Sequence, residues 1–170
     1  MEEQTDLFGV PIPSTDPVLL TFVIIHIAIS LLAVVSGLIA MLSAKTSIRH
    51  KRNESNYFWS ISFSFLTVII LSLMRWPHNV HLLTIGVLTF GLAFTGRKLA
   101  RTKSNYWTRL HAICMGLSYV FLLTGFYVDN GKNLPFWKMF PVWFFYVFPS
   151  IVGIPIIVKV LLTHPLNRSN

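Results

Sequence analysis

The chain has 170 residues, of which 54% are hydrophobic and 12% are charged, and its mean hydropathy is +0.63. A soluble domain of this length has too small a core to bury so much apolar material, so the composition indicates an integral membrane protein. The net charge of +8 is also found in nucleic-acid-binding proteins. Here the cations lie between apolar segments, where they determine membrane topology and contact anionic lipid. We therefore expect a lipid bilayer as the partner and no nucleic acid.

The apolar residues fall into five runs, each long enough to cross a hydrocarbon layer of about 30 Å as a helix. The predicted spans are 18–42, 57–74, 80–99, 106–128 and 139–162. They predict an all-α fold, an integral membrane bundle of five transmembrane helices. Residues 18–162 are expected to form this domain, between an acidic extracytoplasmic leader at 1–17 and a cytoplasmic tail at 163–170.

The leader and the loops predict the orientation of the chain. The leader carries four acids and no Lys or Arg, unlike the basic start of a cleaved signal peptide, so the first span is expected to remain. Eleven of the 14 Lys and Arg residues lie in the loops after the first and third spans or at the C-terminal end. Short cytoplasmic loops retain basic residues, so we expect the N-terminus outside and the C-terminus inside the plasma membrane.

The first and last spans carry signals about helix packing. Small and polar residues of the first span repeat on one stripe, which is expected to face other helices. These residues are His26, Ser30, Ala33, Gly37 and Ala40. The last span contains Pro141, Pro149 and Pro155. Because proline inside a helix removes a hydrogen bond, we expect this helix to be kinked or locally unwound.

The fourth span keeps polar residues despite its apolar character. At helical spacing, one face carries His111, Met115, Ser118, Leu122, Gly125 and Asp129. His111 and Asp129 lie near opposite ends of this face, about 27 Å apart at the rise of an α-helix, so each needs its own partner. The sequence Asp129-Asn130-Gly131 is typical of a turn and predicts that the helix ends there.

The histidines raise the hypothesis of a haem site. His26, His78 and His81 belong to the outer half of the predicted bundle, whereas His50 and His111 belong to the inner half. Two such levels fit a membrane cytochrome, and His26, His111 and His81 are the candidate ligands of a haem b. The structural alternative is a helix-to-helix hydrogen bond from His26, an interfacial His111 and a solvated His50. The pair His78 and His81 lacks a third ligand at a recognisable spacing, so no metal site is expected.

A family resemblance rests on the second half of the chain. Residues 111–137, HAICMGLSYVFLLTGFYVDNGKNLPFW, and the later Pro149, Gly153 and Pro155 are similar to the C-terminal half of the domain-of-unknown-function 2306 family. Residues 88–98, LTFGLAFTGRK, resemble another segment of that family, whereas Glu54 stands where its basic loop has a glycine. The resemblance covers about residues 45–160. It implies a multi-spanning protein of the bacterial plasma membrane, without an established activity.

The sequence carries no catalytic signature. It lacks a GxSxG, HExxH or Walker motif, and no acid lies well inside a predicted span, so no enzyme activity is expected. We expect an accessory or interaction role, with another membrane protein or a further copy of this chain as partner. Two alternatives remain open: a haem-binding redox protein, and a small-molecule carrier that works as a homo-oligomer around the last helix. No cofactor is expected outside the haem hypothesis.

Overall fold

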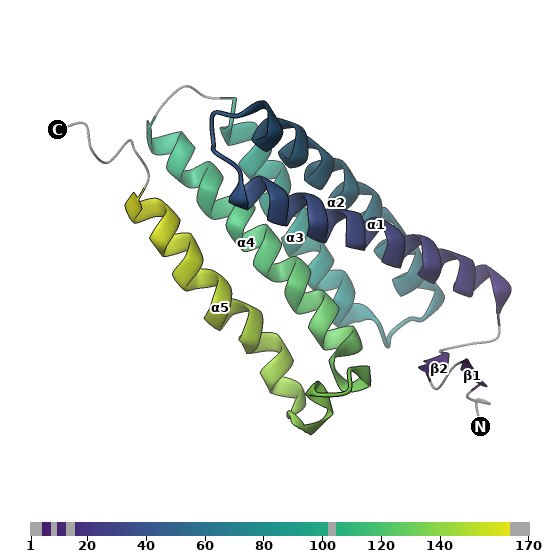
Figure 1. Ribbon diagram of the computed structural model, residues 1–170. Coiled ribbons are helices and arrows are strands. Elements are labelled where there is room, and N and C mark those ends of the chain that lie inside the picture. The colour runs from purple at the N-terminus through teal and green to yellow at the C-terminus, as the bar shows by residue number, and fades with distance from the viewer. Residues whose placement is uncertain (1–4, 8–9, 13–15, 102–104, 164–170) are drawn as a thin grey trace.

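Five long helices make up most of the computed structural model, which describes residues 5–7, 10–12, 16–101 and 105–163 (Figure 1). The helices are α1 (Pro17–Leu42), α2 (Ile48–Met74), α3 (Val80–Leu99), α4 (Asn105–Asn130) and α5 (Val142–Thr163). A short hairpin of β1 (Thr5–Leu7) and β2 (Val10–Ile12) precedes α1, and the 3-10 turns η1 (Gly131–Asn133) and η2 (Trp137–Met139) join α4 to α5. All five helices are long and apolar enough to cross a membrane. The prediction of an all-α bundle of five such helices is confirmed.

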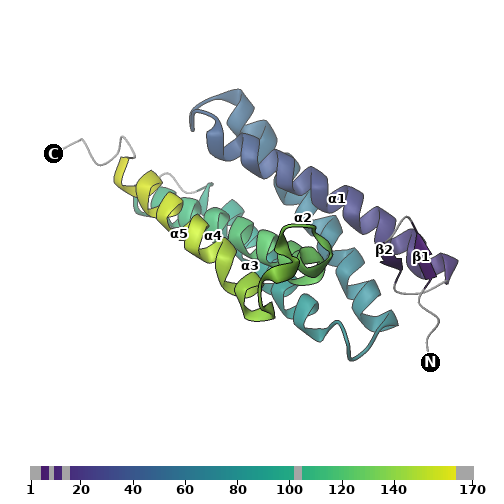
Figure 2. The same ribbon diagram turned by 60° about the horizontal axis from the view of Figure 1, so that its bottom comes forward.

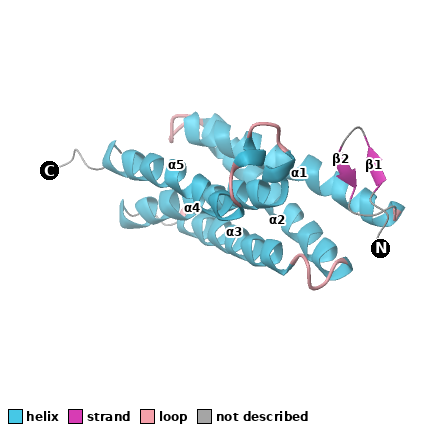
Figure 3. Ribbon diagram, turned by 90° about the horizontal axis from the view of Figure 1, so that it is seen from below, coloured by secondary structure: helices cyan, strands magenta, loops and turns pink. Residues whose placement is uncertain are grey.

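The helices pair in chain order. α1 packs against α2, α3 packs against α4, and α2 lies beside α3, while α5 runs along α4 at the edge of the bundle (Figures 1 and 2). The α1–α2 connection, the end of α3 and the end of α5 lie together, and we call this the basic end because Lys and Arg gather there. The β1–β2 hairpin lies beside the start of α1 at the opposite end (Figure 3). The predicted tail at 163–170 lies, apart from its first residue, outside the described residues.

Local capping explains where the first two helices begin. The Asp16 carboxylate accepts a hydrogen bond of 2.9 Å from the amide of Val18, one residue into α1. Ser47 caps α2 in the same way, accepting a hydrogen bond of 3.1 Å from the amide of His50. The helix therefore begins before the predicted span, which started at Tyr57. α2 begins at Ile48 and includes the polar stretch before Tyr57.

The stripe of small residues on α1 faces the bundle, as predicted. Ala33 is fully buried in the main apolar cluster with Tyr57, Phe58, Ile61 and Ala93. Gly37 lies so close to α2 and α4 that a β-carbon there would stand 2.7 Å from the Tyr119 ring and 2.9 Å from the Tyr57 ring. The absence of a side chain on α1 is what lets two tyrosines fill the space between helices.

The last helix is continuous through its prolines. α5 contains Pro149 and Pro155 within one helical segment, so the predicted local unwinding is wrong, and Pro141 precedes the helix. α5 is held close to α4 where Gly116 receives the side chain of Ile157 and Gly153 receives that of Val120. These two contacts lie on either side of Pro155 and pack α5 against α4 where the sequence alone suggested a break.

Candidate functional site

Polar side chains form three groups at different depths inside the bundle. Near the opposite end, His26 of α1 bonds across to Thr67 of α2, with 2.8 Å between Nδ1 and Oγ1. Because the Thr67 hydroxyl donates to the Ser64 carbonyl at 2.8 Å, its oxygen must accept from the His26 Nδ1–H. Ser30 continues the network to the Ser64 hydroxyl at 2.8 Å and to His26 Nε2 at 3.4 Å. The predicted helix-to-helix hydrogen bond of His26 is confirmed.

A second polar group occupies the middle of the bundle. The Tyr57 hydroxyl of α2 and the Ser118 hydroxyl of α4 are 2.8 Å apart, and Ser118 donates in turn to the carbonyl oxygen of Thr89 on α3 at 2.8 Å. Ser118 has no exposed surface. Its hydrogen is used by Thr89, so Tyr57 is the donor to Ser118. The polar face predicted for α4 therefore meets α2 and α3 at this level.

The third group lies at the basic end and joins two histidines to a carboxylate. His50 and Glu54 stand one turn apart on α2, with 3.7 Å between Nε2 and Oε2, and His111 of α4 brings its Nε2 to 4.0 Å from the same oxygen. All three side chains are largely covered, with exposures of 13 to 17%. The prediction of a solvated His50 is therefore wrong. The helical turn puts His50 and Glu54 on the inner face of α2, with neighbouring arginines on the outer face.

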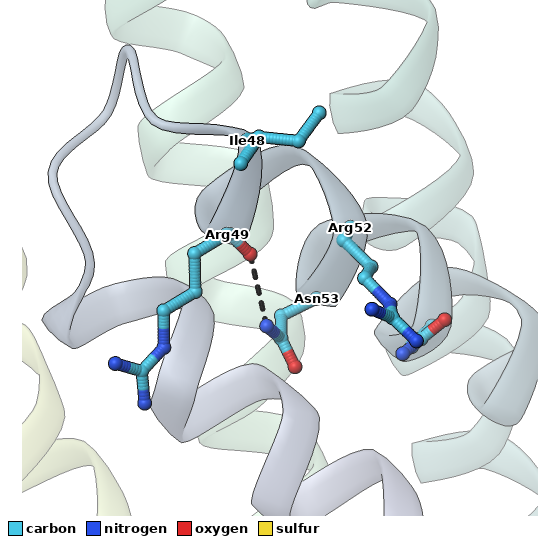
Figure 4. A pocket seen from close by; sticks show the side chains of 5 residues that line it. Ile48, Arg49, Arg52 and Asn53 are labelled. Carbon is cyan, nitrogen blue, oxygen red and sulfur yellow. Dashed lines mark hydrogen bonds between the residues drawn. The ribbon is translucent and has the colours of Figure 1, made fainter.

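The outer face of these first turns of α2 is the basic surface of the molecule. It forms a shallow hollow lined by Ile48, Arg49, Arg52, Asn53 and Asn56. Figure 4 shows both arginine side chains extending away from the helix, while the Asn53 amide donates to the Arg49 carbonyl at 2.9 Å. Extended guanidinium groups beside an apolar helix suit contact with anionic groups of lipid rather than a role inside the bundle.

A cavity of about 350 Å³ occupies the half of the bundle toward the opposite end, among α1, α2, α3 and α4. Its wall is mainly apolar, with Phe65, Ile85 and Leu122 among the lining residues. Its polar lining groups are His26, Ser30, Ser64, Thr89, Tyr127, Asp129 and Asn130. Next to the cavity, the Tyr119 hydroxyl donates to the carbonyl of the lining residue Val34 at 3.1 Å and ties α4 to α1.

The structure places two of the predicted haem candidates, His26 and His111, at different depths of the bundle. His26 and His111 contact α2 near Thr67 and Glu54, positions about 20 Å apart along that helix. His81 is exposed in the first turn of α3. His111 lies near the basic end, as its interfacial prediction requires, but it is bonded inside the bundle, with its Nδ1 2.8 Å from the Gly96 carbonyl. The contacts along α2 therefore separate His26 from His111, whereas His26 and His81 both lie within electrostatic range of Asp129.

Sequence reasoning missed Glu54, Tyr57 and Thr67 as members of these groups. The spacing of four between His50 and Glu54 was a usable signal, because such residues share a helical face. The pairing of Glu54 with His111 depends on how α2 and α4 lie in space, which no local pattern records. No family model, curated protein or solved structure matches this chain.

Proposed function

We propose that this chain is an accessory protein of the bacterial plasma membrane that binds a small, mainly apolar molecule within its bundle. The observation that carries the proposal is the cavity of about 350 Å³ with an apolar wall and a few polar groups. Binding sites for small molecules have this composition: apolar surface supplies affinity and a few polar groups fix orientation. The kinship suggested by the 2306-family resemblance is part of the same proposal.

The chemistry of the cavity indicates what kind of molecule would bind. Asp129 is the one carboxylate among the lining residues, and Asn130 and His26 line the cavity with it. A ring or short chain with one amino group would bury its apolar part beside Phe65 and Leu122 and direct the amine to Asp129. The size of the cavity falls at the small end of ligand sites, which favours a molecule smaller than a phospholipid.

Photolabelling in lipid nanodiscs tests this proposal. The probes are a diazirine-bearing benzylamine and its neutral methylbenzene counterpart, and labelled residues are mapped by mass spectrometry. We expect saturable labelling by the amine on cavity residues such as Leu122 and Phe65, and a several-fold loss of this labelling in Asp129→Asn. Labelling by the neutral probe should change little, because its apolar contacts remain.

Two glycines provide a matched pair for the same experiment. Gly125 lines the cavity, and a β-carbon there meets its nearest neighbour, Ile85, at an ordinary 3.5 Å. Gly91 is exposed on α3, with nothing within 4 Å of such a carbon. Gly125→Phe should fill the cavity and abolish saturable labelling, whereas Gly91→Phe should leave it intact. Labelling that never saturates, or that survives Gly125→Phe, would refute the proposed site.

A further inference from the structure

The group at the basic end has the residue types and the arrangement of a metal centre. The ligand atoms of His50, Glu54 and His111 all lie within 4.8 Å of one another. Two imidazole nitrogens and a carboxylate oxygen are ligands that divalent zinc, iron and related transition metals accept. The three come from two helices, so an ion bound to them would also join α2 to α4.

Hydrogen bonds behind the two rings fix which nitrogen points inward. His50 Nδ1 lies 2.8 Å from the Ala40 carbonyl oxygen, and His111 Nδ1 lies 2.8 Å from the Gly96 carbonyl oxygen. A carbonyl only accepts, so each Nδ1 carries a hydrogen and each neutral ring directs its Nε2 lone pair at Glu54. Metal-binding histidines are oriented in this way, with the second ring nitrogen donating to a carbonyl or carboxylate.

The distances leave room for an ion and not for direct hydrogen bonds. The separations of 3.7 Å and 4.0 Å between Nε2 and Glu54 Oε2 exceed the usual hydrogen-bond length of about 2.7–3.2 Å. Bonds of about 2.0–2.2 Å from one metal ion hold its ligands roughly 3 to 3.5 Å apart. Each Nε2–Oε2 separation would have to shorten by less than about 1 Å, and a separation of up to 4.8 Å between ligand atoms by roughly 1 to 2 Å, for the three to hold one ion.

The backbone behind the two histidine rings belongs to the negative ends of two helices. Ala40 and Gly96 lie in the last turns of α1 and α3, where helix carbonyls give the helix end a partial negative charge. Two cations close to the group also have other partners: Lys45 donates to the Met41 carbonyl at 3.1 Å while it interacts electrostatically with Glu54 and His50, and Arg97 lies over the Phe58 ring at 4.4 Å. The negative ends of α1 and α3 therefore offset the partial positive charge of the first turns of α2 and α4, and the Glu54 carboxylate supplies the negative charge of the site.

We propose that His50, Glu54 and His111 bind one divalent transition-metal ion at the basic end of the bundle. With three protein ligands, the ion keeps at least one coordination position for water or another small ligand, as catalytic zinc and non-haem iron centres do. This site is separate from the cavity of the proposed function and does not depend on it.

Metal content and metal affinity test the site. Full-length protein without an affinity tag is stripped with a chelator, exchanged into metal-free detergent buffer and titrated with Zn²⁺, and bound metal is measured by mass spectrometry. We expect about one ion per chain. Glu54→Gln and His111→Gln should each weaken zinc binding on the order of 100-fold, since each removes one of three ligands. The matched control is His78→Gln combined with His81→Gln, two exposed histidines, and it should bind as the unaltered chain does.

Two further measurements keep the test decisive where a variant folds poorly. The X-ray absorption spectrum of the unaltered protein with zinc should show two imidazole donors with oxygen donors completing the shell. Zinc should also raise the melting temperature of the unaltered protein and of the histidine control, because a ligand of the folded state stabilises it. A chain that binds less than a tenth of an ion at saturating zinc, or a spectrum without imidazole, overturns the proposal.

Discussion

Polar residues inside the apolar helices form hydrogen bonds to neighbouring helices. Ser118 lies between the hydroxyl of Tyr57 and the carbonyl of Thr89, so one buried hydroxyl bonds two other helices. A buried polar group is stable only while its partners remain, and the loss of one partner costs more than the loss of both. The energetic role of Ser118 is therefore to accept the Tyr57 hydrogen, and this role can be measured.

Ser118→Ala should lower the free energy of unfolding by about 1 to 2 kcal/mol, because it leaves the Tyr57 hydroxyl buried without an acceptor. Tyr57→Phe should cost less, about 0.6 kcal/mol, because Ser118 keeps its bond to Thr89. The double variant should be no less stable than Ser118→Ala alone. Denaturant unfolding in mixed micelles gives the three values. Strictly additive losses would contradict the assigned donor and acceptor.

A pair of glycine substitutions separates close helix packing from helix propensity. Gly37→Ala places a methyl group 2.7 Å from the Tyr119 ring and should cost about 1 to 3 kcal/mol through overpacking. Gly91→Ala, on the exposed face of α3, meets nothing within 4 Å and should be neutral or slightly stabilising. Melting temperatures in one detergent compare the two directly. An equal fall in both would mean that Gly37 does not lie between the tyrosines.

The five helices differ in how many neighbouring helices they pack against. α5 packs against α4 and lies at the edge of the bundle, whereas α2 contacts both α1 and α3 (Figure 1). The approach of α5 depends on Gly116, where an added β-carbon would stand 2.7 Å from Ile157. At the opposite end of α5, the rings of Trp137 and Phe148 contact Tyr127 in tilted and edge-on arrangements, and Phe144 lies beside Trp137. One glycine and one aromatic cluster therefore attach this helix at its two ends.

Gly116→Leu should release the part of α5 near the basic end and leave the rest of the bundle in place. Hydrogen exchange measured by mass spectrometry should rise several-fold in residues around Ile157, with little change in α1 and α2. Gly91→Leu serves as the control, since it adds the same side chain on an exposed face. Uniform exchange across all helices would show instead that α5 is required for the whole fold.

The elements also show how far sequence patterns reach. Runs of apolar residues predicted five helices, and the spacing of small residues predicted the buried face of α1, because both follow from helix periodicity and lipid thickness. The first turns of α2 were not included in the predicted span, because their residues are mostly basic or polar and do not form an apolar run. The meeting of Glu54 with His111, and the cavity beside His26, depend on the tilt between helices, which no single segment determines.

In the whole molecule, the clustered Lys and Arg residues of the described segments lie at one end of the bundle. The α1–α2 connection with the first turns of α2, and the last turn of α3, bring Lys45, Arg49, Arg52, Arg97 and Lys98 to the basic end. This clustering is what the positive-inside rule uses to set orientation. The proposed orientation therefore has the basic end in the cytoplasm and the β1–β2 hairpin outside.

Reporter fusions test this orientation. Alkaline phosphatase, which is active only after export, should work at the N-terminus and within residues 131–135. Green fluorescent protein should be fluorescent when fused after Arg101 or after Asn170. The expectation follows from the cations, which resist transfer across the membrane. Phosphatase activity from a fusion at Arg101 would reverse the orientation and move the three-residue group at the basic end to the outer surface.

The division of hydrogen bonds between neighbouring and distant helices has a consequence for biosynthesis. The bonds of His26 and His50 lie within the α1–α2 hairpin, and the bond from His111 to Gly96 lies within the α3–α4 hairpin. Each hairpin can therefore form the hydrogen bonds of these histidines as soon as its second helix leaves the ribosome and enters lipid. Contacts such as Tyr57 with Ser118 and Glu54 with His111 join one finished hairpin to the other. We therefore expect insertion by helix pairs, with the central hydroxyls and the Glu54 carboxylate making their contacts at the later step, when the two pairs associate.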